Sequence, residues 1–150
     1  MKTFSYNELY VEKAQIALAN MLDYAVNDLH FSINESYNMF LSSSISSRFA
    51  LGDCSIIMGK SGVELVHDII YELNVTDVSS LPSPSFSFER TPIYWTGWAL
   101  SYYQWYTTRS FQDINKVIPI DRVLSLYFPY HEMDIMQFVD KMNEMYNKGK

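Results

Sequence analysis

Length, composition and charge narrow the classes of protein to which this chain can belong. Its 150 residues, 48% of them hydrophobic and 19% charged, are typical of one globular domain (residues 1–150) and exclude a disordered chain. The net charge is −6 and the 11 Lys and Arg residues are scattered, which disfavours direct nucleic-acid binding, and a single cysteine excludes an internal disulfide and a cysteine-based zinc site.

The first third of the chain predicts two helices. Apolar residues recur at steps of three and four from 5 to 29, which predicts one long amphipathic helix. Ser32 and Glu35 then stand at capping-box spacing, in which each side chain bonds the backbone amide of the other residue, so a second helix begins there. Its apolar period continues through LSSSISSR, and Gly52 marks the expected end.

A third helix and a connector are predicted in the middle of the chain. Ser61 and Glu64 repeat the capping-box spacing in front of an apolar face, which predicts a helix from 59 to 73. Residues 74–90, NVTDVSSLPSPSFSFER, are rich in Ser and Pro and predict a connector loop. The alternation of Phe and Ser around Phe86 allows a short strand within it.

An aromatic-rich helix is predicted from 91 to 108, where Thr91 fits the N-cap and Pro92 the first helical position. One face carries bulky rings at alternating steps of three and four, namely Trp95, Trp98, Tyr102 and Trp105. We interpret this face as the buried side of a central core helix, with a ring-lined groove for a ligand or partner as the alternative. The opposite face is narrow, and its small residue Gly97 would let another backbone approach closely.

Three shorter helices complete the prediction, at 110–117, 121–128 and 132–146. Pro119 and Pro129 are expected to end the first two, because proline cannot continue a helix interior. Together the pattern predicts an all-α fold. It is a compact single-domain bundle of six or seven helices around the aromatic-rich helix, with the Ser/Pro-rich stretch as its one long connector.

Two motifs suggest chemistry without completing a site. GDCSIIMGKSG looks like a phosphate-binding loop, but six residues separate Gly52 from Gly59 where such a loop has four. We expect no nucleotide there, although Lys60 and Ser61 at the helix start are candidates for holding an anion. HEMD, residues 131–134, gathers three metal-ligand types but lacks the second His one turn on, so no metal site is predicted. We find no set of residues that could catalyse a reaction. We therefore expect that the chain binds no cofactor and is not an enzyme.

Three stretches carry a resemblance to a protein family. LANMLDYAVNDL, GDCSIIMGKSGVELVHDII and YWTGWALSYYQWYTTRSFQDINKVIPIDRVLSLYFPYHEMDIMQFVDKM resemble an uncharacterised family of small bacterial helical proteins, and the resemblance covers most of the chain outside residues 74–90. Genes of that family often lie beside genes for toxin-like ADP-ribosyltransferases. The resemblance therefore implies an antitoxin, immunity or accessory role, and it assigns no catalytic residues.

The first functional hypothesis is a protein-interaction module. The chain lacks a secretory signal and a membrane-spanning apolar run, so we expect a cytoplasmic protein without membrane contact. It would bind and block or stabilise a toxin-type enzyme through an acidic surface, which suits a basic partner. Two tyrosines off the aromatic face are expected to be exposed, and they head the predicted partner-binding residues: Tyr94, Tyr103, Gln104, Arg109, His131, Glu132 and Asp134.

Other hypotheses remain open. The chain could bind a small anionic ligand, as a binding protein or an enzyme, in a pocket between the aromatic-rich helix and the helix start at Lys60 and Ser61. A helix-turn-helix regulator is a third hypothesis, which the acidic charge disfavours. A homo-oligomer is compatible with all three.

Overall fold

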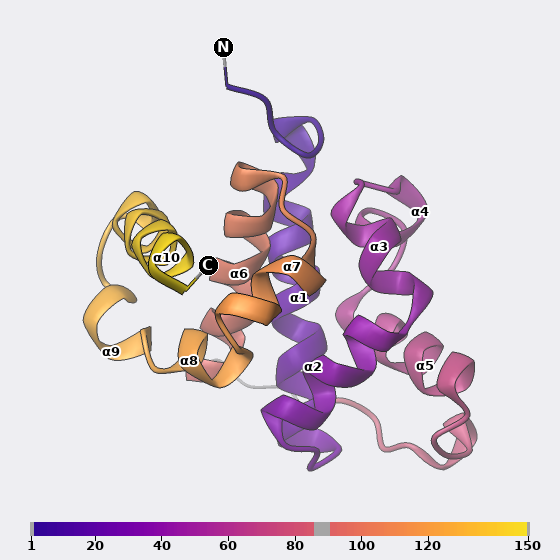
Figure 1. The fold of residues 1–150 in the computed structure, drawn as a ribbon. Coiled ribbons are helices and arrows are strands. Elements are labelled where there is room, and N and C mark those ends of the chain that lie inside the picture. The colour runs from indigo at the N-terminus through magenta and orange to yellow at the C-terminus, as the bar shows by residue number, and fades with distance from the viewer. Residues whose placement is uncertain (1, 86–90, 150) are drawn as a thin grey trace.

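The computed structural model describes residues 2–85 and 91–149, and this part of the chain is helical and compact, without a strand (Figure 1). The predicted all-α class is therefore confirmed. The α-helices are α1 (Val11–Asp23), α2 (Ile33–Ser42), α3 (Ser44–Ala50), α4 (Cys54–Ile57), α5 (Gly62–Leu73), α6 (Pro92–Thr107), α7 (Phe111–Val117), α8 (Ile120–Leu124), α9 (Tyr127–Tyr130) and α10 (Ile135–Gly149). Two 3-10 turns, η1 (Glu8–Tyr10) and η3 (Val78–Ser80), and a π-helical turn, η2 (Tyr24–Asp28), accompany them. None of the helices in these two ranges is long and apolar enough to cross a membrane.

The described residues form ten α-helices, whereas the sequence predicted six or seven. One reason is a break in the predicted second helix at Ser43, whose backbone is extended and whose hydroxyl donates to the Phe40 carbonyl at 2.7 Å. The side chain of Glu72, on α5, then accepts hydrogen bonds from the amide and hydroxyl of Ser44 at 2.8 and 2.6 Å. The start of α3 is thus stabilised by a tertiary contact, which no local pattern reveals.

Two further short helices account for the rest of the difference. Asp53 caps α4 by accepting from the Ser55 amide at 2.9 Å, where the sequence predicted only a turn. Pro129 was expected to end a helix but is the third residue of α9, so that prediction is wrong. The first four amides of a helix have no intrahelical acceptor, so a proline there costs no hydrogen bond.

The predicted first helix reaches Asp28, but its last five residues are π-helical rather than α-helical. A π-helical turn, η2, follows α1 and directs Tyr24 toward α5 and the connector. The Tyr24 hydroxyl donates to the Pro82 carbonyl at 2.5 Å and lies 3.1 Å from Nε2 of His67. The Ser85 amide donates to the Asp28 carboxylate at 3.2 Å. The described part of the connector is therefore held against η2 by hydrogen bonds. The short strand expected around Phe86 lies outside the described residues.

The close approach expected at Gly97 is confirmed. Helices α1 and α6 lie side by side and make the most extensive contact between any two helices of the described chain (Figure 1). A Cβ atom at Gly97 would lie 2.7 Å from the Leu18 carbonyl oxygen and 2.8 Å from Cα of Ala19. The backbones of the two helices are in contact there, and only glycine leaves room for this packing.

Burial along α6 does not follow the division into an aromatic face and a narrow face of small and polar residues, although Trp95 and Trp105 of the aromatic face are buried. The polar residues Ser101 and Gln104 are buried, whereas Trp98 and Tyr102 of the aromatic face are only half-buried. The reason is that α1, α8, α9 and α10 all contact α6, so most of its circumference is covered. A periodic pattern within one helix cannot show how many neighbours that helix has.

Candidate functional site

Five of the seven predicted partner-binding residues form two groups at opposite ends of α6. Tyr94 and His131 meet at a surface pocket near its first turns. Tyr103, Gln104 and Arg109 belong to a hydrogen-bonded network near its end. The seven residues therefore do not make one contact surface.

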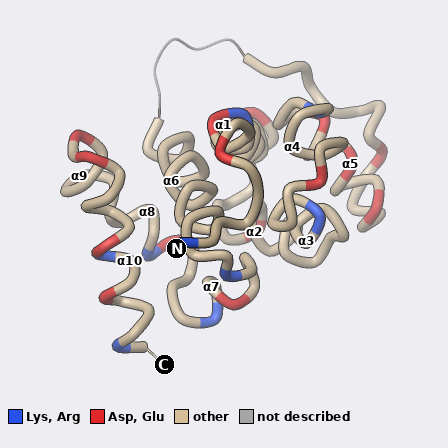
Figure 2. Tube along the Cα trace, turned by 90° about the horizontal axis from the view of Figure 1, so that it is seen from above, with Lys and Arg blue, Asp and Glu red and all other residues tan. Residues whose placement is uncertain are grey.

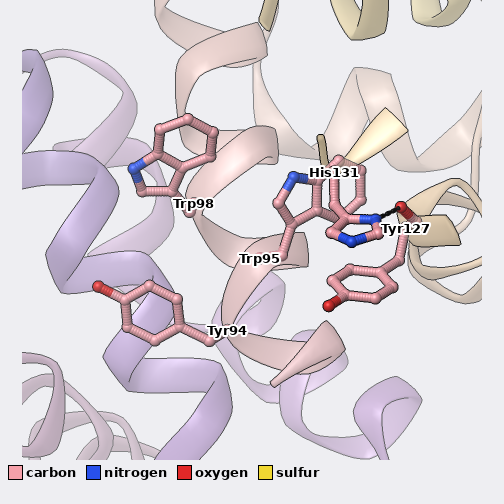
Figure 3. A pocket seen from close by; sticks show the side chains of 5 residues that line it. All are labelled: Tyr94, Trp95, Trp98, Tyr127 and His131. Atoms are coloured by element: carbon pink, nitrogen blue, oxygen red, sulfur yellow. Dashed lines mark hydrogen bonds between the residues drawn. The ribbon is translucent and has the colours of Figure 1, made fainter. Parts of the chain in front are cut away.

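The aromatic pocket is lined by five ring-bearing side chains, which are Tyr94, Trp95, Trp98, Tyr127 and His131, and it has a volume of about 260 Å³ (Figure 3). The first two turns of α6 supply three of them, and α9 with the residue after it supplies the other two. Trp95 lies between the Tyr94–Trp98 side and the Tyr127–His131 side of the pocket. Bringing these rings together requires α9 to pack on α6, which it does.

His131 is held in a defined orientation on the α9 side of the aromatic pocket. Its ring stacks on Tyr127 with centroids 4.1 Å apart and an interplanar angle of 11°. Its Nδ1 lies 2.7 Å from the Tyr127 carbonyl oxygen (Figure 3). Because a carbonyl only accepts, Nδ1 carries the hydrogen, and in the neutral imidazole Nε2 is an acceptor. The Glu132 carboxylate lies 3.7 Å from Nε2, and its side chain is 87% exposed.

Two tryptophans, Trp95 and Trp98, connect the pocket to neighbouring helices. Trp95 is buried and meets Tyr127 and Phe138 edge to face, with centroids 5.7 and 5.2 Å away, which links the pocket to α10. Trp98 is half-buried, and its carbonyl accepts from the Gln15 side chain of α1 at 3.3 Å. Within the described residues no acceptor bonds the Trp98 indole N–H. The rings are thus preorganised by packing, and the Trp98 side chain keeps a polar donor for a ligand or water.

Two exposed apolar side chains adjoin the aromatic pocket in sequence. Phe128, between the pocket residue Tyr127 and Pro129 on α9, is 83% exposed, and Met133, two residues after His131, is 53% exposed. Sequence reasoning missed Tyr127 and Phe128 as site residues, because it assigned them only to the last turn of the helix predicted at 121–128. The available signal was the cluster YFPY: three rings on a single helical turn cannot all face the core.

Tyr103 and Gln104 are buried, so the exposure expected of Tyr103 is wrong. The Tyr103 hydroxyl donates to Oδ1 of Asn143 at 2.7 Å and accepts from Nη1 of Arg109 at 2.6 Å. Burial raises the pKa of Tyr103, although the Arg109 charge opposes this rise. Nε2 of Gln104 donates to the carbonyl oxygen of Arg109 at 3.1 Å and to the Ser5 hydroxyl at 3.0 Å. The physical reason is that α10 and the N-terminal segment cover this side of α6.

Arg109 and Asp134 have partners within the fold. The Arg109 guanidinium stacks over the Tyr146 ring, 3.9 Å from its centroid, and bonds Oδ1 of Asn143 at 2.9 Å. The Asp134 carboxylate accepts from the Met136 amide at 2.8 Å, which is the helix-start role that carboxylates favour. Of the seven predicted residues, Tyr94, His131 and the exposed Glu132 are those at the aromatic pocket or beside it.

The candidate anion-binding residues, Lys60 and Ser61, already have partners within the chain. Lys60 forms an ion pair with Asp68, and the Ser61 hydroxyl accepts from the Glu64 amide at 3.2 Å in the predicted capping box. The hollow beside Lys60 is lined by residues of α1 and of the segment before α5. This hollow faces α1, whereas the sequence hypothesis placed a pocket between Lys60 and α6.

Neither charge nor metal ligands indicate another kind of site. Lys and Arg are spread over the trace rather than gathered on one face (Figure 2). Across residues 2–85 and 91–149, no group of three His, Cys, Asp or Glu side chains could hold a metal ion.

A scan against protein-family models found no match, and neither did searches of curated proteins and of solved structures. The chemistry of the aromatic pocket is thus the observation that bears most directly on function.

Proposed function

We propose that the chain is a cytoplasmic protein-interaction module whose contact surface is the aromatic pocket together with the exposed side chains of Phe128 and Met133. The observation that carries this proposal is a concave, ring-lined surface whose residue Tyr127 contacts the exposed Phe128 ring, with centroids 5.4 Å apart, and whose residue His131 is followed two residues later by the exposed Met133. Interface centres are enriched in aromatic residues and Met, and pockets that accept an anchoring side chain supply most of the binding energy. Tyr94 and His131, predicted as partner-binding residues from sequence, line this pocket.

The partner we propose is a toxin-type enzyme, and the role is antitoxin-like, immunity-like or accessory. The family resemblance supports this choice of partner, through the ADP-ribosyltransferase genes that often lie beside genes of that family. The net charge of −6 supports a basic partner surface. The module would act by covering the cleft of the enzyme, with α6 as the central helix that positions the contact surface.

Binding of a small anion at Lys60 and Ser61, the alternative considered from sequence, gains no support from the contacts of these residues. The Lys60 ammonium is paired with Asp68, and the Ser61 hydroxyl is engaged at the helix start. An anion would have to displace Asp68 before it could use the Lys60 charge.

The experiment is co-expression with the product of the adjacent gene, followed by size-exclusion chromatography at micromolar concentration. We expect one peak that contains both proteins. Phe128→Ala should weaken the complex by about 10-fold or more, as expected for an aromatic anchor. Tyr71→Ala is the matched control, because Tyr71 on α5 is 80% exposed and lies away from the pocket in sequence.

Three outcomes would contradict the proposal. Two independent peaks would reject the partner, and equal weakening by Phe128→Ala and Tyr71→Ala would reject the surface. Concentration-dependent elution of the chain as a dimer, lost in Phe128→Ala, would assign the surface to a homo-oligomer instead.

A further inference from the structure

The lining of the aromatic pocket specifies the chemistry of what enters it. All five lining residues present rings, and none carries a permanent charge. The faces of Trp and Tyr rings carry negative electrostatic potential, so an enclosure of such rings attracts organic cations as well as apolar groups. The surroundings of the pocket decide between these two classes of ligand.

One carboxylate lies beside a lining residue of the aromatic pocket, and another bonds the N-cap residue of α6, the helix that supplies three lining residues. On the α9 side, Glu132 lies 3.7 Å from Nε2 of His131. On the α6 side, Asp23 accepts from the Thr91 hydroxyl at 2.7 Å, and that hydroxyl in turn caps the amide of Tyr94 at 3.0 Å. In a chain of net charge −6, these carboxylates favour a cation over a neutral apolar group.

Hydrogen-bond acceptors favour a guanidinium over an ammonium. Nδ1 of His131 is bound to the Tyr127 carbonyl, so in the neutral ring Nε2 presents a lone pair. The Glu132 carboxylate supplies further acceptors nearby. A guanidinium is planar, stacks on rings and carries five N–H donors, whereas an ammonium is a compact and strongly hydrated point charge.

The volume of the pocket limits the ligand to one side chain. About 260 Å³ lies just below the range of ~300–1,000 Å³ that is typical of pockets for drug-sized ligands. A nucleotide would therefore project far outside it. The same chain already holds a guanidinium in this way, because Arg109 stacks over Tyr146 at 3.9 Å and donates to the Tyr103 hydroxyl at 2.6 Å.

We propose that the aromatic pocket binds an arginine side chain presented by the partner protein, with the guanidinium against the rings that line the pocket and its N–H groups directed to His131 and Glu132. This inference rests on the proposed function, since it names the chemistry of the partner at the same surface. The pocket can nevertheless be tested without the partner, with peptides as probes.

The probe is the tripeptide Gly-Arg-Gly, blocked at both ends, and its control is the same peptide with citrulline, which is a neutral isostere of arginine. The chain has three Trp residues, so NMR of the labelled protein gives three indole N–H signals. We expect saturable shifts of the Trp95 and Trp98 signals. The Trp105 signal should stay unchanged, because its N–H donates to the Tyr6 carbonyl at 2.7 Å, away from the pocket. Citrulline should bind about 10-fold more weakly, and a lysine peptide should lie between the two.

Variants identify which residues carry the selectivity for the cation. Glu132→Gln should weaken arginine binding severalfold and leave citrulline binding unchanged. Glu12→Gln, at an exposed position on α1, is the matched control and should change neither. Tyr127→Leu keeps the site apolar and should abolish the preference for arginine over citrulline, and thermal unfolding of each variant confirms that it is folded.

The results separate this inference from the proposed function. Equal binding of arginine and citrulline, tighter binding of a leucine peptide, or no saturable shift would overturn the arginine pocket even if the protein complex forms. Saturable, charge-dependent binding together with two independent peaks in chromatography would retain the arginine pocket and reject the proposed enzyme partner.

Discussion

The guanidinium of Arg109 and the hydroxyl of Tyr103 form a partly buried pair, with Nη1 2.6 Å from the hydroxyl oxygen. Oδ1 of Asn143, on α10, accepts from both groups, at 2.9 and 2.7 Å. This triangle joins the end of α6, the following loop and α10. A hydrogen bond to a charged group contributes more than a neutral one, so the triangle should be a measurable part of the stability.

Tyr103→Phe removes the hydroxyl from this triangle while keeping the ring in the core. We expect the free energy of unfolding to fall by about 1.5–3 kcal/mol, the range for hydrogen bonds to charged groups. Chemical denaturation of both proteins measures the change. Tyr71→Phe removes a hydroxyl from a ring that is 80% exposed and should have no effect. Equal stability of the two variants would mean that the Arg109 contact contributes nothing.

Gly97→Ala tests the contact between α1 and α6. Alanine is the better helix former by about 1 kcal/mol, so on local grounds the change should stabilise the chain. The new methyl group would instead meet the Leu18 carbonyl oxygen at 2.7 Å, and backbone cannot move aside cheaply. We therefore expect a loss of about 1–3 kcal/mol, measured by denaturant unfolding. A stabilised Gly97→Ala protein would contradict the close approach.

Tyr37 is buried, and its hydroxyl has no hydrogen-bond partner among the described residues. Burial raises the pKa of Tyr37 above the ordinary value of 10.0. The folded state therefore holds this proton more tightly than the unfolded state, and the associated stability is present below pH 10 and lost as the pH rises beyond it. Tyr37→Phe should be neutral or slightly stabilising at pH 7 and should resist alkaline unfolding better than the parent chain. Unfolding followed by circular dichroism between pH 8 and about 12 measures this. An unchanged alkaline midpoint would show that Tyr37 ionises without unfolding.

The capping box at the start of α5 stabilises the fold in a way that is lost at low pH, whereas the contribution of Tyr37 is lost at high pH. The Ser61 amide, which donates to the Glu64 carboxylate at 3.1 Å, lowers the pKa of Glu64 below its ordinary value of 4.5, and the nearby Ser61 hydroxyl lowers it further. The stability from this carboxylate is present above pH 4.5 and is lost as the pH falls below it. Glu64→Gln should flatten the stability profile in that acidic range, whereas Glu12→Gln on the exposed face of α1 should leave the profile unchanged. Parallel profiles for Glu64→Gln and the parent chain would exclude the carboxylate as a contributor.

Local signals in the sequence predicted most helix starts correctly. Ser32 with Glu35, and Ser61 with Glu64, form both hydrogen bonds of a capping box, and Thr91 caps α6 with Pro92 in its first turn. These predictions succeeded because a capping motif contains both partners within four residues. The break at Ser43 was missed because the contact that stabilises the start of the next helix joins Ser44 to Glu72, which is distant in the chain.

The candidate site was predicted only in part, for a related reason. His131 and Tyr94 were identified as single residues, but their meeting depends on α9 packing against α6. The burial of Tyr103 depends likewise on Asn143, which is on another helix. A helical pattern reports the preferences of one helix, whereas a pocket or a buried network is made by the neighbours of that helix.

Because α1 packs mainly on α6, its packing is delayed while the ribosome makes the chain between the two helices. The nascent chain completes α1 at Asp23, but the helix on which α1 mainly packs ends only at Thr107. At ~5–20 residues per second this interval lasts about 4–17 s, long enough for a chaperone to meet the waiting apolar face of α1. Helix α1 therefore cannot complete its main packing contact until α6 has been made.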